Sequence, residues 1–160
     1  MLFAKVKVTA IVVLTLGIAT GGFTAGYQQF TVRAEDEKGK SDKERLLGAW
    51  KLESGEQAGK AIEGKELDEI KERDFIFKAD TVIARHEVKY TIEASKQPKQ
   101  IELDVTEGPE RERGIWRGIY ELKGDDLTIC LAMPNLDRPD KFETKEGVMG
   151  VMLMKFKRAK

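Results

Sequence analysis

The sequence predicts an all-β domain of short antiparallel strands that follows an apolar N-terminal segment. Beyond Arg45 the apolar residues recur with a period of two, which is typical of strands with one buried and one solvated face. The segments between these runs are rich in glycine, aspartate and proline, the residues of turns. Seven or eight short strands at regular spacing favour a sandwich or a closed barrel. Closure has the physical advantage that no long strand edge stays unpaired.

The first element is the apolar segment. Val8–Tyr27 is a run of twenty uncharged, mostly apolar or small residues, and Lys5 and Lys7 precede it. Twenty helical residues rise about 30 Å, enough to cross a hydrocarbon core, and basic residues before such a run stay in the cytoplasm. We interpret residues 1–34 as a signal peptide cleaved after Val32-Arg33-Ala34 or as an uncleaved signal-anchor helix, and we favour the anchor. Both alternatives place the rest of the chain in the cell envelope, at the outer face of the cytoplasmic membrane or exported.

Residues 35–45 form a charged linker, because nine of these eleven residues carry a charge. Near its end, Ser41 and Glu44 have the S-x-x-E spacing of a capping box. In that motif each side chain satisfies an amide of the first helical turn. We therefore expect a short helical turn just before the first strand.

Residues 46–158 contain the predicted strands. The alternating runs are residues 48–53, 74–78, 81–85, 88–93, 101–106, 115–122, 127–131 and 151–156. Gly124-Asp125 predicts a tight hairpin between two of them. The one helical candidate is Gly64–Glu72, where Leu67 and Ile70 stand three positions apart among charged residues. The sequence thus predicts one folded domain with a single short helix after the first strand.

Composition excludes several classes of function. Three of the 28 basic residues lie in residues 1–34, which leaves 25 basic against 28 acidic residues in the rest of the chain. Such a surface has no basic stripe for a phosphate backbone, so we expect no nucleic-acid partner. Cys130 is the only cysteine, which excludes an internal disulfide and cysteine-rich redox or zinc motifs. His86 is the only histidine, and we expect neither a metal site nor a cofactor.

The start of the first strand carries a family pattern. Gly48-Ala49-Trp50 matches the G-x-W signature of lipocalin-like barrels. Further matching stretches are Leu46–Lys51 (LLGAWK), Ser95–Glu107 (SKQPKQIELDVTE), Gly118–Ala132 (GIYELKGDDLTICLA), and Arg138-Pro139 followed by Phe142. On these residues the chain resembles an uncharacterised lipocalin-like domain family of planctomycetes over residues 44–158. It departs from the family at Ala94, where members often have aspartate.

The resemblance implies an eight-stranded antiparallel lipocalin-like barrel with one short helix, here preceded by an N-terminal apolar helix. It implies no activity. It also implies structural roles for Trp50, which would plug one end of the barrel, and for Arg158, which follows the last strand and would lie over the indole. An arginine over an indole face contributes about 0.5–2 kcal/mol.

The candidate ligand surface is a set of strand residues that are able to point into the barrel. The set consists of Phe75, Phe77, Tyr90, Trp116, Tyr120, Met152 and Met154. As the lining of an apolar pocket it would be adaptable, because methionine is flexible. Alternatively, these side chains fill the interior and form a packed core. A barrel of eight strands is just wide enough to be filled by side chains or to hold one small ligand. The short chain favours the filled core.

The remaining polar candidates do not predict a catalytic site. His86 lies between two strands among charged residues, and we interpret it as an exposed turn residue. Cys130 is interpreted as a small packed side chain, because no base lies near it in the sequence. Glu102 and Asp104 share the strand face opposite the apolar residues, so we expect them to be solvated.

The loop Asn135–Phe142 is the longest irregular segment after the hairpins, and loops on a rigid scaffold often bind partners. Within it, two interpretations of Arg138 stay open. The guanidinium binds an anionic partner, or it pairs with Asp137 or Asp140.

Two function classes follow from these observations. The first is a non-catalytic binding or interaction module for an unknown protein partner, tethered to the membrane through residues 8–27. The second is a carrier of a small apolar ligand inside the barrel. A continuous cavity of a few hundred Å³ would favour the carrier, and a packed interior would favour the module. An enzyme would need converging titratable groups in a cleft, and the sequence predicts none.

Overall fold

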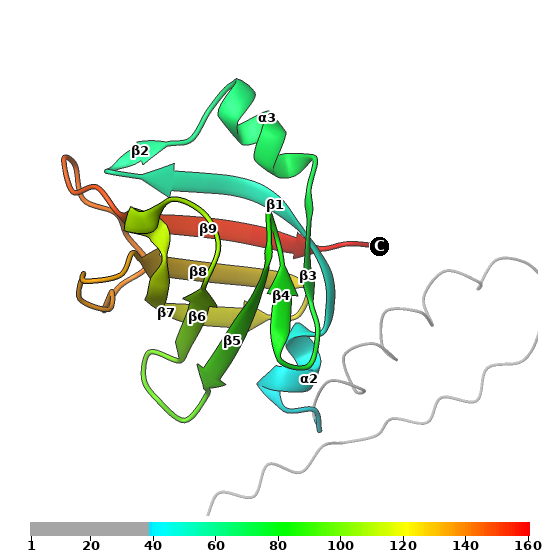
Figure 1. Ribbon diagram of the computed structural model, residues 1–160. Helices are drawn as coiled ribbons and strands as arrows, with labels where there is room; N and C mark the ends of the chain where they lie inside the picture. Colours follow the sequence, from blue (N-terminus) through cyan, green and yellow to red (C-terminus); the bar gives the residue numbers. More distant parts are fainter. Residues whose placement is uncertain (1–38) are drawn as a thin grey trace, which may run out of the picture.

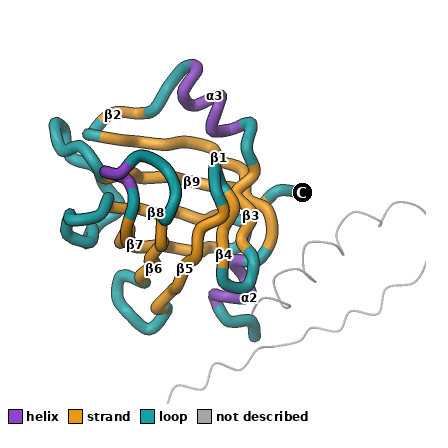
Figure 2. Tube along the Cα trace, viewed as in Figure 1, coloured by secondary structure: helices purple, strands orange, loops and turns teal. Residues whose placement is uncertain are grey.

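The computed structural model of the protein describes residues 39–160. The predicted apolar leader, residues 1–34, lies outside the described residues, as does the beginning of the charged linker. Of the helices between residues 39 and 160, none has the length and apolar character needed to cross a membrane. These residues form a mostly β domain with a few short helices, shown as a ribbon in Figure 1 and by secondary structure in Figure 2.

The elements of the domain match the predicted runs. The helices are α2 (Asp42–Leu46), α3 (Lys65–Lys71) and the 3-10 helix η1 (Glu110–Glu112). The strands are β1 (Gly48–Gln57), β2 (Lys60–Ala61), β3 (Asp74–Phe77), β4 (Thr81–Ile83), β5 (Glu87–Glu93), β6 (Gln100–Val105), β7 (Gly114–Lys123), β8 (Asp126–Ala132) and β9 (Val151–Arg158). Each predicted strand is present. The short strand β2 and the single turn η1 are additions that the sequence analysis does not foresee.

Eight of these strands close into an antiparallel barrel, which confirms the barrel and excludes the sandwich. From β3 to β9 each strand pairs with the next, β3 also pairs with β1, and β9 returns to pair with β1. At this seam the register runs from Trp50 opposite Arg158 to Gln57 opposite Met152, with a bulge between Leu52 and Ser54. Because every barrel strand has a neighbour on both sides, the unpaired edges of an open sheet are removed.

Helix α2 lies at the end of the barrel at which β1 begins (Figure 1). The buried Trp50 indole bonds to this helix, and we name this end the closed end. Ser41 and Glu44 form the predicted capping box: the Glu44 amide donates to the Ser41 hydroxyl, and the Ser41 amide donates to the Glu44 carboxylate. The Trp50 ring is fully buried, and its Nε1 donates to the carbonyl of Leu46, the last residue of α2, at 2.8 Å. This hydrogen bond holds α2 against the closed end of the barrel.

Arg158 covers the Trp50 ring, with its guanidinium carbon 4.3 Å from the ring centroid. The guanidinium also donates to the carbonyl oxygens of Arg45 and Leu47 and, at 3.1 Å, to the Asp125 carboxylate. This is the packing that the sequence predicts. It joins the last strand, the β7–β8 turn and the C-terminal end of α2 at one point.

A carboxylate anchors the other side of α2. Asp42 accepts from the Tyr120 hydroxyl at 2.8 Å and from Lys99 Nζ at 2.6 Å, and the Arg45 guanidinium lies 3.5 Å away. Burial raises the pKa of Asp42, but the hydrogen bonds from Lys99 and Tyr120 and the charges of Lys99 and Arg45 outweigh burial, so this pKa lies below its ordinary value of 3.8. The ionised Asp42 carboxylate therefore stabilises the docked helix.

The half of the barrel next to α2 is filled with side chains. Phe77 and Tyr90 meet edge to face with ring centroids 5.2 Å apart, and Tyr120 is 1% exposed. The Tyr90 hydroxyl donates to the Lys78 carbonyl at 2.9 Å. A buried phenol needs such a partner, and both tyrosines have one. The buried rings of this half are thus packed against one another and hydrogen-bonded.

A second apolar cluster lies on the outer surface of the barrel wall. Ile119, Cys130 and Leu153 are buried there, and Phe142 and Val151 pack against them. Burial raises the pKa of the Cys130 thiol to about 11. Cys130 is thus the packed side chain that the sequence predicts. The connection between β8 and β9 covers it.

Arg138 fixes that connection to the wall. Its guanidinium donates to the carbonyl oxygens of Ile101 and Gly118, at 3.1 and 2.7 Å, and pairs with Glu102 at 2.6 Å. The interpretation that pairs Arg138 with Asp137 or Asp140 is therefore wrong, because its carboxylate partner is Glu102. The other interpretation, an anionic partner, stays a prediction. A side chain at Gly118 would disturb the pairing of β7 with β8, since a Cβ there would lie 2.4 Å from the Cys130 carbonyl oxygen.

The substitution Arg158→Met tests the seal of the closed end. Losing the guanidinium over the indole and leaving two carbonyl oxygens with fewer donors should lower the free energy of unfolding by about 2 kcal/mol. Chemical denaturation measures this change. Lys157→Met, on the exposed side of the same strand, is the matched control and should change stability little; equal losses in both variants would contradict the role of Arg158.

Asp42→Asn tests the anchor of α2. Because the folded-state pKa of Asp42 is depressed, the carboxylate contributes stability above its ordinary pKa and loses it as the pH falls through the lower folded-state value. The stability gap between the natural chain and the variant should therefore be full near about pH 6 and shrink below about pH 4. Denaturation midpoints across this range measure the gap, and a gap that does not change with pH would refute the anchor.

The Cys130 thiol should be unreactive in the folded protein. With a pKa of about 11, its thiolate fraction near pH 8 is about a hundredfold below that of a free cysteine, and the outer cluster covers it. Iodoacetamide labelling followed by mass spectrometry measures the rate. Labelling should be fast only in guanidinium chloride, and fast labelling of the folded chain would show that the outer cluster opens.

Candidate functional site

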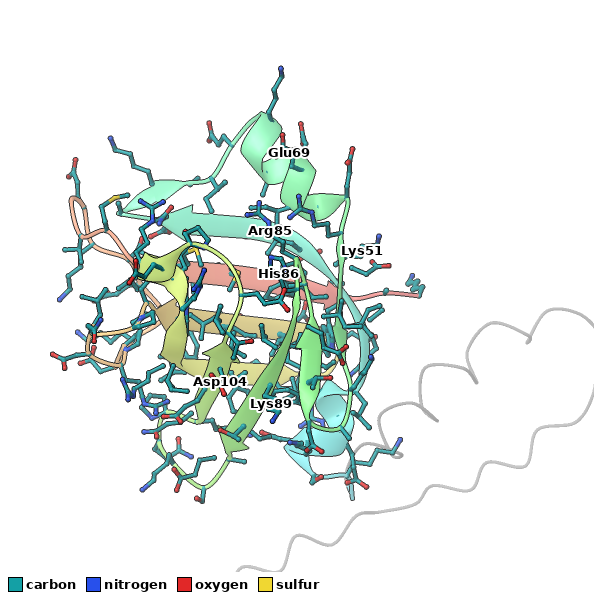
Figure 3. The ribbon with its side chains drawn as sticks, viewed as in Figure 1. Lys51, Glu69, Arg85, His86, Lys89 and Asp104 are labelled. Atoms are coloured by element: carbon teal, nitrogen blue, oxygen red, sulfur yellow. The ribbon has the colours of Figure 1, made fainter. Side chains whose placement is uncertain are left out.

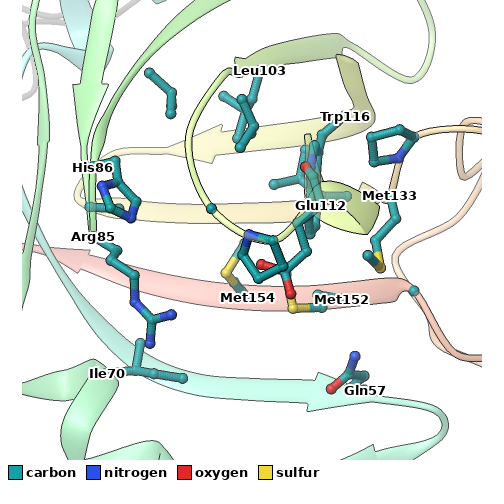
Figure 4. A pocket seen from close by; sticks show the side chains of 18 of the residues that line it. Gln57, Ile70, Arg85, His86, Leu103, Glu112, Trp116, Met133, Met152 and Met154 are labelled. Carbon is teal, nitrogen blue, oxygen red and sulfur yellow. The ribbon is translucent and has the colours of Figure 1, made fainter. Parts of the chain in front are cut away.

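The half of the barrel away from α2 is hollow, with a cavity of about 750 Å³. Apolar side chains from β1, β3 and β5–β9 form its inner wall: Leu52, Phe75, Val88, Leu103, Val105, Trp116, Leu131, Met152 and Met154. Figure 4 shows Leu103, Trp116, Met152 and Met154 around this space. A cavity of this size suits a single small-molecule ligand.

The structure divides the predicted ligand set into two groups. Phe75, Trp116, Met152 and Met154 line the cavity. The other three members, Phe77, Tyr90 and Tyr120, are absent from its lining and pack in the filled half instead. The prediction that these three line a pocket is therefore not met, because strand alternation places a side chain inside the barrel without fixing its depth along the barrel axis.

Two contacts hold the cavity wall in place. Phe75 meets Phe156 edge to face with ring centroids 4.8 Å apart, which forms the boundary toward the filled half. The Trp116 indole is 9% exposed, and its Nε1 donates to the Glu112 carbonyl of η1 at 2.7 Å. The unforeseen turn η1 thus has a structural reason, since it satisfies the one polar atom of the largest side chain in the wall.

The mouth of the cavity is formed by segments that connect the strands. Ile70 belongs to α3, and Arg73 lies just after this helix. Arg85 and His86 belong to the β4–β5 turn. The β6–β7 connection, which contains η1, and the β8–β9 connection complete the rim. In Figure 4, Arg85 and His86 lie on one side of the mouth, and Gln57 and Met133 on the other. These segments meet because alternate connections of an antiparallel barrel fall at the same end.

The mouth carries more positive than negative charge. Arg73, Arg85 and Arg111 line it together with two carboxylates, Glu107 and Glu112. Both carboxylates have partners on the protein. His86 Nδ1 lies 3.0 Å from the Glu107 carboxylate, and Arg111 Nε lies 3.6 Å from that of Glu112.

His86 occupies the turn that the sequence predicts, and its side chain is 39% exposed. Sequence reasoning missed that this turn borders a cavity, and it missed Arg73 and Arg85 altogether. A signal existed, because the lengths and order of the strands determine which connections share one end of a barrel. The predicted ligand set contains only strand residues.

The other polar candidates lie away from the cavity. Asp104 is exposed on the outer face of β6, where Figure 3 shows it beside Lys89, its partner on β5. Glu102 also faces outward and is bound by Arg138. Between residues 39 and 160, no group of three or more histidine, cysteine, aspartate or glutamate side chains is placed to hold a metal ion.

Comparison with protein-family models, with curated proteins and with solved structures gives no match to this chain. The resemblance to the lipocalin-like family therefore stays a prediction, based on the residues quoted for it. The closed barrel itself is established by its strand pairing, independently of that resemblance.

Proposed function

We propose that the protein is a non-catalytic binding protein that holds a small apolar ligand in the hollow half of its barrel. The observation that carries the proposal is the cavity of about 750 Å³ with an apolar inner wall. Its size and its connection to the surface through a mouth suit a ligand that enters and leaves. The two methionines in the wall, Met152 and Met154, would let the wall adapt to the ligand's shape.

Desolvation supplies the driving force for this binding. A ligand that buries about 300 Å² of apolar surface gains about 7 kcal/mol. The loss of translational and rotational freedom offsets at least several kcal/mol of this gain. Apolar contact alone therefore supports modest affinity, and tighter binding needs a polar group that recognises the ligand.

The positions of the potentially reactive side chains favour ligand binding without a chemical reaction. The Cys130 thiol lies in the outer cluster, on the far side of the barrel wall from the cavity. His86 and Glu107 pair with each other at the rim. We also propose that the protein lies in the cell envelope, with the membrane tether supplied by the apolar run Val8–Tyr27.

A protein-interaction module is the second candidate. It is favoured by apolar side chains that stay exposed in the β8–β9 connection: Leu136 is 37%, Val148 43% and Met149 68% exposed. Leu136 and Met149 also line the cavity, so a partner bound there would cover the mouth. The two candidates differ in what occupies the interior.

The substitution Leu103→Trp tests the proposed function by filling the cavity. Binding of the neutral fluorescent probe N-phenyl-1-naphthylamine should weaken at least about tenfold, because the larger ring occupies the probe's volume. Fluorescence titration measures the affinity, and circular dichroism checks that the variant folds.

Asp104→Trp is the matched control, since it adds the same ring one residue further along β6 on the exposed outer face. This variant should bind the probe as the natural chain does. Equal affinity of the natural chain and both variants would place the probe outside the barrel and reject ligand binding in the cavity.

A further inference from the structure

The charges at the mouth allow the ligand to be specified further, in an inference that rests on the proposed function. We propose that the ligand is a single-chain amphiphile with one anionic headgroup, a carboxylate or a phosphate. Its chain lies in the cavity, and its headgroup is bound at the mouth by the guanidinium groups of Arg73 and Arg85.

Arg73 and Arg85 differ from the other charged groups of the mouth. Glu107 and Glu112 are paired with His86 and Arg111. Among residues 39–160, neither the Arg73 nor the Arg85 guanidinium has an ion-pair or hydrogen-bond partner. The positive charge of the mouth is therefore concentrated on two groups that still have all their donors available.

Arg73 and Arg85 lie at the mouth of the cavity. Arg73 follows α3 and is half-buried, whereas Arg85 is exposed in the β4–β5 turn. Figure 4 shows the Arg85 side chain extending toward Ile70, in the last turn of α3. Arg73 and Arg85 both line the same cavity as Phe75 and Met154. A headgroup between them would thus leave its chain facing an apolar wall.

Two arginines at the mouth would select for an anionic headgroup. A carboxylate or phosphate accepts the paired donors of a guanidinium with good geometry, and two arginines supply more than one such pair. A neutral alcohol with the same chain gains little from these groups, and a quaternary ammonium meets uncompensated positive charge. Because Arg85 is exposed, the gain for an anion should be moderate and should fall with ionic strength.

The experiment compares four twelve-carbon probes on the purified full-length chain, each below its critical micelle concentration. The probes are dodecanoate, dodecyl phosphate, dodecanol and dodecyltrimethylammonium, and displacement of N-phenyl-1-naphthylamine measures their affinities. At least one of the two anions should bind about tenfold more tightly than dodecanol, and the cation most weakly. Raising the salt concentration from about 0.05 to about 0.5 M should reduce this anion preference.

The variants Arg73→Gln, Arg85→Gln and the double variant locate the headgroup. Each single change should weaken anion binding about three- to tenfold, and the double variant should bind anion and alcohol about equally. Lys96→Gln is the control, because it removes an exposed cation from the β5–β6 turn, at the end of the barrel opposite the mouth. It should leave all four affinities unchanged.

The outcomes separate this inference from the proposed function. If anions and dodecanol bind the natural chain equally well, the inference is overturned and apolar binding in the cavity stands. If the anion preference persists in the double variant, or is lost in Lys96→Gln, the arginine site is likewise overturned. If the natural chain binds neither N-phenyl-1-naphthylamine nor any of the four amphiphiles, both the inference and the proposed function fail.

Discussion

The pairing of β9 with β1 is the constraint on which the rest of the structure depends. This seam closes the barrel, and its first register pair places Trp50 opposite Arg158. The indole and the guanidinium that covers it therefore sit on neighbouring strands, so closing the sheet and sealing its end are one event. Through Arg158 the seam also bonds to the carbonyl groups at the end of α2. A chain that failed to close here would lose the plug, the docked helix and the enclosed interior together.

The interior is asymmetric because side-chain volume is distributed unevenly along the barrel axis. Large rings fill the closed half, where Trp50, Tyr120 and Phe77 pack with almost no exposure. Toward the mouth, Phe75 and Trp116 share the inner wall with smaller aliphatic side chains such as Val88 and Val105, and the space between opposite walls stays open. The closed half thus supplies stability while the open half is free for binding. Charged groups differ between the two ends as well: an ionised Asp42 network lies at the closed end, and at the mouth Arg73 and Arg85 have no side-chain partner within the part of the chain that the structure describes.

Much of the fold could be predicted from the sequence, because period-two alternation decides which side chains face inward and glycine-rich turns mark where strands end. The capping box at Ser41 and Glu44 and the helix over Gly64–Glu72 were recognisable from local chemistry alone. The candidate site was only half predictable. Alternation cannot tell that Tyr90 lies deep in the filled half whereas Trp116 borders the cavity, and Arg85 acquires its position only when closure brings separate turns to one end. The partner of Arg138 was missed for the same reason, since Glu102 is far from it in the chain.

The central claim is that one end of this barrel is hollow and takes up a ligand. Carbon-13 NMR of the methionine methyl groups tests it directly, because the five methionines include Met152 and Met154 in the cavity wall and Met149 exposed at the rim. On titration with an apolar probe, the signals of Met152 and Met154 should shift furthest and saturate together. Shifts confined to Met1 and Met149 would place the probe on the leader or the rim, and would contradict a ligand site inside the barrel.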